Sequence, residues 1–132
     1  YRNVIKRIIE LKEDGYPVLF SKKNLEYALN WKYGYDTDKI MGEEPNFDYI
    51  KCNAGKNFGI IDVNGDVYPC PTLVDTGKPL NGLTHGMAKA FENASGHNCK
   101  TCHIPCQNEF NLMYSLDPST IFNIIRNYKF KG

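Results

Sequence analysis

The sequence has no long apolar run and no marked excess of charge of either sign. Its apolar stretches are only a few residues long, far short of the ~20 residues that span a bilayer. No charged start followed by an apolar run marks a signal peptide. Lys and Arg number 16 against 15 Asp and Glu, which argues against nucleic acid or a membrane surface as a partner. We therefore expect a soluble protein, and the cysteine count described below favours the cytoplasm.

Several catalytic motifs are also missing. There is no Gly-rich phosphate loop, no Ser-His-Asp order and no His-Glu-x2-His, each of which places reactive groups at a fixed spacing. The paired carboxylates Glu43-Glu44 fall in a predicted loop, where a solvated acidic pair is the ordinary interpretation. These absences exclude the conventional hydrolase classes.

The chain has 132 residues, the size of one compact domain that buries roughly two thirds of the surface exposed when unfolded. Hydrophobic residues make up 42%, which predicts a modest core to which a metal site would add stability. The sequence begins at Tyr1 instead of Met, so we expect a segment of a longer chain.

Helical spacing of apolar residues predicts a helix over residues 4–11 that stops at Gly15, and a second helix that is capped by Ser21 and ends near Gly34. Residues 35–46 lack periodicity and predict a long connection. Asn64-Gly65 between apolar stretches predicts a hairpin with a type I′ turn, with strands over 58–63 and 66–68. The fold class is therefore α+β, a small hairpin-centred, cysteine-rich domain with flanking helices.

Two further helices are predicted near the C-terminus. Thr84 is expected to cap a short helix that the Ser95-Gly96 pair ends. Asp117-Pro118 is expected to open the last helix, because proline is tolerated at the first helical position. The apolar face of this last helix is predicted from Ile121, Phe122, Ile124, Ile125 and Tyr128.

The five cysteines carry the strongest chemical signal. An odd count leaves one thiol over in a disulfide framework, and in a reducing compartment clustered cysteines more often hold a metal. Cys52 and Cys70 stand on either side of the predicted hairpin, which would bring their sulfurs together. Cys99-Lys-Thr-Cys102 is expected to present two more sulfurs from one tight turn. Four thiolates suit either a tetrahedral zinc ion or a four-iron cluster.

Other candidates near these cysteines are weaker. Cys106 could replace one of the four ligands, bind a second cluster or be a small buried residue. His97 and His103 flank the Cys99 pair and would allow a mixed Cys/His zinc site, although both fit ordinary surface histidines better. His85 lies near an expected helix start and has less claim still.

The segment Cys52-Asn-Ala-Gly-Lys-Asn-Phe-Gly-Ile-Ile-Asp-Val-Asn-Gly-Asp-Val-Tyr-Pro-Cys70 resembles the opening of the SPASM and Twitch domains that follow the barrel of many radical S-adenosylmethionine (radical SAM) enzymes. In those domains the first cysteine precedes a hairpin, a Gly-x4-Cys element ends it, and a later Cys-x2-Cys completes an auxiliary [4Fe-4S] cluster. The resemblance implies Cys52, Cys70, Cys99 and Cys102 as ligands, with Cys106 as a further metal-site candidate.

The resemblance also divides the chain. Residues 1–34, which include Leu11-Lys-Glu-Asp-Gly-Tyr-Pro-Val-Leu-Phe-Ser21, look like the end of a radical SAM barrel and its linker. Residues 35–51 would be a connecting loop, and residues 52–132 the SPASM/Twitch-like cluster domain. The implied partner is the N-terminal radical SAM barrel of the parent chain.

Two departures from the family pattern limit what the resemblance implies. Five cysteines can fully ligate only one cluster, which fits the shorter Twitch type better than the two-cluster SPASM type. The Cys-x3-Cys-x2-Cys motif of the SAM-cleaving cluster is absent, so SAM would bind only in the barrel and this segment would not cleave it alone. The segment would belong to an oxidoreductase as its auxiliary electron-transfer or substrate-facing domain. The alternative is a structural zinc-binding interaction module, and a disulfide-linked secreted domain ranks third. Aerobic purification could also load zinc into a cluster site.

Overall fold

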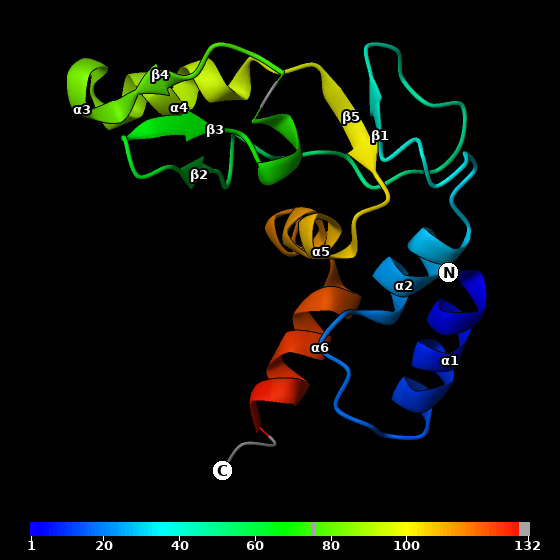
Figure 1. Ribbon diagram of the computed structural model, residues 1–132. Coiled ribbons are helices and arrows are strands. Elements are labelled where there is room, and N and C mark those ends of the chain that lie inside the picture. The colour runs from blue at the N-terminus through cyan, green and yellow to red at the C-terminus, as the bar shows by residue number, and fades with distance from the viewer. Residues whose placement is uncertain (75, 130–132) are drawn as a thin grey trace. The chain divides into compact units, whose positions relative to one another are not determined.

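In the computed structural model, which describes residues 1–74 and 76–129, helices occur together with short strands, as the α+β prediction requires (Figure 1). The chain divides into two compact units. Unit 1 holds residues 1–51 and the described residues from 100 onward, and unit 2 holds residues 52–99. The division before Cys52 coincides with the predicted start of the cluster domain, whereas residues from 100 onward group with the N-terminal part. No helix in the described ranges combines the length and apolar character needed to cross a bilayer.

Unit 1 begins with two helices whose boundaries follow local signals. Helix α1 (Arg2–Glu13) is followed by Gly15 at φ +92°, the backbone conformation that glycine tolerates best. Helix α2 (Lys22–Leu29) starts at the predicted cap, since the Ser21 hydroxyl accepts the N–H of Asn24 at 3.4 Å. The helix ends at Leu29, before the expected Gly34. Its inward face buries Asn24, Leu25 and Ala28.

The rest of unit 1 contains two helices and a short sheet. Strand β1 (Lys39–Met41), inside the predicted connection, pairs with β5 (Cys99–Cys102), which starts at the last residue of unit 2. Helix α5 (Pro105–Tyr114) was not predicted, and α6 (Pro118–Lys129) starts where Asp117-Pro118 predicts. Phe122 and Ile125 on α6 are exposed, not buried, and the side chain of Tyr128 lies outside the described residues.

Unit 2 is built on a small antiparallel sheet. Strand β3 (Asp66–Tyr68) lies between β2 (Ile60–Ile61) and β4 (Leu80–Asn81). The register pairs Ile61 with Val67 on one side and Val67 with Leu80 on the other. Val67 is buried with Ala90 and Ala94 of helix α4 (Met87–Ser95), so the helix covers one face of the sheet.

The predicted hairpin is present, but its turn is different. Gly65 has φ +90°, whereas Asn64 is not among the described residues with positive φ, so the two-residue type I′ turn is wrong. The backbone instead closes Gly65 N–H onto the Asp62 carbonyl at 3.0 Å. The Asp62 carboxylate accepts the N–H groups of Asn64 at 2.9 Å and Asp66 at 3.0 Å. The aspartate therefore stabilises a longer loop with glycine at its last position.

The helix predicted to start at Thr84 is also corrected. Thr84 lies inside a short helix, α3 (Gly82–His85), and the residue that caps this helix is Asn81. The Asn81 side chain accepts the N–H groups of Leu83 at 3.0 Å and Thr84 at 3.2 Å. Gly86 at φ +85° then separates α3 from α4, which ends at Ser95 as predicted. The remaining helical turn of unit 2 is η1 (Pro71–Leu73).

Candidate metal centre

Three of the predicted ligands lie together in unit 2. Cys70 and Cys99 are buried at 5% and 9% exposure in one core cluster with Ala54, and the partly buried Cys52 packs against this cluster. The three cysteines come from three separate segments, before β2, after β3 and at the start of β5. The fold thus collects thiols that are far apart in the sequence, as the hairpin argument predicts for the first two.

Local backbone structure holds each of these cysteines in place. After Cys52 the chain makes a tight turn, in which Gly55 donates its N–H to the Phe58 carbonyl at 2.7 Å. Cys70 follows β3 with an extended backbone, φ −162° and ψ 168°, and leads into η1. Its sulfur lies 3.2 Å from the hydroxyl of Thr72. A hydroxyl at a cysteine sulfur is the kind of contact that tunes a thiolate ligand.

His97 belongs to the same site, which the sequence interpretation as a surface histidine missed. Its Nε2 lies 2.7 Å from the Ala54 carbonyl, and its Nδ1 accepts the backbone N–H of Cys99 at 3.0 Å. Because an N–H can only be accepted by an unprotonated nitrogen, this pattern assigns the neutral ring with its hydrogen on Nε2. The ring therefore ties the segment after Cys52 to the segment before β5.

The surroundings of Cys52 favour its thiolate. The side-chain hydrogen bond with Cys99 lowers the pKa of Cys52 to about 5, helped by His97 and the Ala54 backbone, while burial acts in the opposite direction. The contact with Cys52 also raises the pKa of His97, against the effect of burial. The Cys99 N–H at Nδ1 opposes that rise because it favours the neutral ring. A thiolate at neutral pH is the form that binds metal.

The remaining two cysteines belong to unit 1. Cys102 is buried at 5% exposure, with its sulfur 3.8 Å from the side-chain oxygen of Asn108. Asn108 in turn donates from Nδ2 to the Cys102 carbonyl at 2.8 Å. Cys106 is exposed on the first turn of α5, 3.9 Å from the amide nitrogen of Gln107. The option of a small buried residue for Cys106 is therefore wrong.

The Cys99-x2-Cys102 pair does not form the predicted tight turn. Both cysteines lie on strand β5, which pairs with β1. Side chains alternate between the two faces of a strand, so residues three apart point to opposite faces. The spacing alone does not reveal this, because Cys-x2-Cys is compatible with an extended backbone as well as with a turn.

The other histidines are also placed by the structure. His103 packs its ring against Trp31 and Tyr35, with centroids 5.3 Å and 5.4 Å apart, and both ring nitrogens are buried. It is not the surface histidine expected from the sequence. His85 is exposed, and its Nδ1 lies 2.7 Å from the hydroxyl of Thr84.

The donors fit a thiolate site in their chemistry. Unit 2 supplies three cysteines without a disulfide in one cluster, one of them with a lowered pKa, and thiolates are ligands for both zinc and iron–sulfur clusters. Among the described residues, however, no three or more His, Cys, Asp or Glu side chains converge on one point that would hold a single ion. Zinc needs such convergence, whereas a four-iron cluster bonds each thiolate to a different iron.

Comparison of the chain with protein-family models, with curated proteins and with solved structures finds no match.

Proposed function

We propose that this chain is the auxiliary cluster domain of a radical SAM enzyme and binds one [4Fe-4S] cluster. The observation that carries the proposal is the gathering of Cys52, Cys70 and Cys99 in one buried cluster of unit 2. The family pattern implies Cys102 as the fourth ligand, although Cys99 and Cys102 point to opposite faces of β5 in this structure. The barrel of the parent enzyme, which would bind and cleave SAM, is the partner.

When bound, such a cluster supplies a site that accepts or passes on one electron near a substrate. The residues around the cysteines would set how readily it does so. Ala54 and Leu73 exclude water from the thiols, the Thr72 hydroxyl contacts the Cys70 sulfur, and His97 fixes the chain on both sides of the site. Burial and hydrogen bonds to sulfur are the two properties by which a protein adjusts a cluster potential.

A structural zinc module is the second candidate, since four thiolates also suit zinc. Cys52 has a lowered pKa and lies beside His97. Both properties favour metal binding, but neither selects zinc over iron. Zinc in this site would tie the Cys52 turn to the start of β5 and act only on stability. The metal content must therefore decide between the two functions.

The test is anaerobic reconstitution of the purified protein with iron and sulfide. We expect about four irons and four sulfides per chain and an absorption band near ~400 nm from thiolate-to-iron charge transfer. Cys52→Ser and Cys70→Ser should lose this iron and sulfide. Cys106→Ser is the matched control, because Cys106 is exposed in unit 1 and should leave both unchanged.

Two results would overturn the proposal. One is a single zinc per chain that iron and sulfide do not displace, which would establish the structural module. The other is unchanged iron and sulfide in both Cys52→Ser and Cys70→Ser, which would remove these cysteines from the ligand set.

A further inference from the structure

The fourth ligand of the candidate metal centre is where the family pattern and the structure disagree. We call the thiols of Cys52, Cys70 and Cys99 the gathered thiols, and all three belong to unit 2. Cys102 belongs to unit 1 and points to the opposite face of β5 from Cys99. A fourth donor for the gathered thiols is therefore better sought within unit 2.

The contacts of Cys102 explain its burial without a metal. Its side chain is 5% exposed, and its sulfur lies 3.8 Å from the side-chain oxygen of Asn108. Asn108 also donates to the Cys102 carbonyl at 2.8 Å, so α5 holds the end of β5 in place. A cysteine in such surroundings behaves as a small buried residue, which is the commonest environment of this residue type.

His97 is a donor of unit 2 that lies beside the gathered thiols. Its ring bonds the Cys52 side chain, a contact that raises the pKa of His97. Its Nδ1 accepts the backbone N–H of Cys99 at 3.0 Å. The imidazole thus contacts two of the three cysteines. Imidazole is a common zinc ligand, and in Rieske clusters histidine takes the place of cysteine on iron.

The hydrogen bonds of the His97 ring match those of a ligating histidine. A metal-bound imidazole usually donates its other ring N–H to a carbonyl or a carboxylate, which fixes the tautomer. Nε2 of His97 lies 2.7 Å from the Ala54 carbonyl, which places the hydrogen on Nε2 and the lone pair on Nδ1. Ligation through Nδ1 would exchange one hydrogen bond, that from the Cys99 N–H, for a metal–nitrogen bond. The contact with Ala54 would be kept.

We propose that His97, through Nδ1, is the fourth ligand of the centre in place of Cys102. The centre is then built from unit 2 alone, with the gathered thiols as its other three ligands. This inference rests on the proposed function, in which these thiols hold a four-iron cluster. A neutral imidazole carries less negative charge than a thiolate, so a cluster with one histidine accepts an electron more readily than one with four cysteines.

The experiment compares variants of the full chain after anaerobic reconstitution with iron and sulfide. We expect Cys102→Ser to keep about four irons and four sulfides per chain. His97→Ala should hold at most about three irons, because one iron loses its protein ligand, and His97→Cys should restore about four. His85→Ala is the matched control, since His85 is an exposed histidine of unit 2 and its removal should change neither count.

A spectroscopic measurement distinguishes a ligand from a residue that only holds the backbone in place. Pulsed electron paramagnetic resonance of the reduced, reconstituted chain should show a histidine-nitrogen coupling that changes when the histidine rings are labelled with ¹⁵N. The coupling should persist in His85→Ala and vanish in His97→Cys. The reduction potential of His97→Cys should also be lower than that of the unmodified chain, because a thiolate adds negative charge to the cluster.

Three results would overturn this inference while leaving the proposed function intact. One is a cluster whose spectrum is unchanged by histidine labelling. Another is loss of the cluster from Cys102→Ser while circular dichroism shows that variant to be folded. The third is a full set of four irons in His97→Ala. A chain that takes up no iron and sulfide at all would remove the proposed function and this inference together.

Discussion

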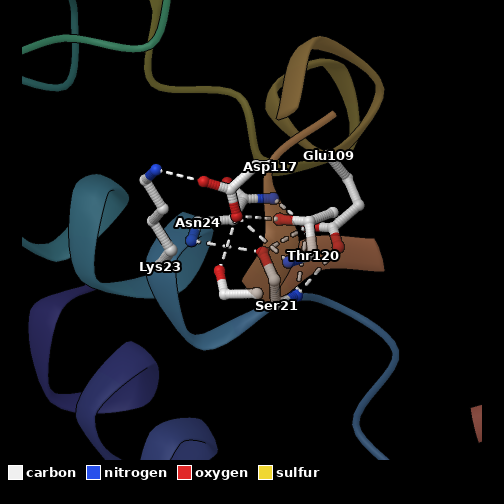
Figure 2. A network of polar contacts seen from close by, with 7 residues as sticks. Ser21, Lys23, Asn24, Glu109, Asp117 and Thr120 are labelled. Carbon is white, nitrogen blue, oxygen red and sulfur yellow. Dashed lines mark hydrogen bonds and ion pairs between the residues drawn. The ribbon is translucent and has the colours of Figure 1, made fainter. Parts of the chain in front are cut away.

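Glu109 should be the most important single carboxylate for the stability of unit 1. From α5 it accepts the Ser21 N–H at 3.0 Å and 3.1 Å, the Ser21 hydroxyl at 3.0 Å and the Asn24 amide at 2.7 Å (Figure 2). Ser21 is 1% and Asn24 0% exposed, so water does not readily replace these contacts. The carboxylate therefore joins the cap of α2 to α5, two elements that lie far apart in the sequence.

The size of the effect follows from which donors lose their partner. In Glu109→Ala the Asn24 amide still donates to the Pro105 carbonyl at 2.7 Å, so the Ser21 N–H and hydroxyl are the donors that lose their acceptor. Hydrogen bonds to a charged group contribute about 1.5–3 kcal/mol each, and the half-buried position of Glu109 lets some water enter. We expect Glu109→Ala to lower the free energy of unfolding by about 3–4 kcal/mol. Glu109→Gln keeps one acceptor oxygen and should cost about 1–2 kcal/mol.

Urea unfolding followed by circular dichroism measures this difference. The matched control is Glu10→Ala, which removes an exposed carboxylate that pairs with Arg7 at 2.9 Å on the same helix, and it should change stability by less than about 0.5 kcal/mol. Glu109→Ala should also lower the melting temperature by roughly 10 °C or more. If Glu109→Ala and Glu10→Ala unfold at the same urea concentration, the network does not stabilise the fold in the way argued.

Three further predictions test unit 2 and the start of α6. In reduced, metal-free protein, iodoacetamide should label Cys52 with a midpoint near its pKa of about 5, and a midpoint near ~8.5 would contradict the assigned thiolate. Burial alone would raise the pKa of Asp117, but hydrogen bonds from Lys23, Ser119 and Thr120 hold it below its usual range. Asp117→Asn should therefore lower the free energy of unfolding by about 1–2 kcal/mol at pH 7. This deficit should shrink as the pH falls below about 4, because the stabilisation from a depressed carboxyl pKa is complete above the unfolded pKa and is lost on protonation. A deficit of equal size at pH 7 and pH 3 in urea titrations would refute this. Gly55→Ala places a Cβ 2.5 Å from the Ala94 carbonyl oxygen at φ +73° and should lower the free energy of unfolding by about 3 kcal/mol. In the control Gly77→Ala the new Cβ meets nothing within 4 Å, and the free energy of unfolding should change by less than about 0.5 kcal/mol. Equal unfolding midpoints for the two variants would contradict the steric explanation.

The elements with strong local signals could be predicted from the sequence. The Ser21 cap and the Asp117-Pro118 start are both present, because each depends on contacts within a few residues. The hairpin was found for the same reason, but its turn type was not. Asn64-Gly65 alone favours a two-residue turn. The Asp62 carboxylate favours a longer loop instead, because it accepts the N–H groups of Asn64 and Asp66.

Helix α5 shows where apolar periodicity fails as a signal. Its buried positions are Asn108, Asn111 and Leu112, so two of the three inward side chains are polar. A face of this kind has no apolar pattern to detect. Asn108 is buried because it donates to the Cys102 carbonyl, a contact that only the folded chain reveals. The one local signal was Pro105 at the first helical position.

The candidate metal centre also combines residues that a local signal predicts with residues that only the folded chain brings together. Counting cysteines and noting the hairpin predicted that Cys52 and Cys70 would meet, since a hairpin brings its two ends together whatever its exact turn. The role of His97 could not be predicted in this way, because its partners are a carbonyl before the hairpin and an N–H after α4. A histidine two residues before a cysteine was the available signal, and it gains meaning only when the backbone brings Ala54 to the ring. Sequence spacing therefore identifies the donors of a site, and the groups that orient those donors emerge only from the tertiary structure.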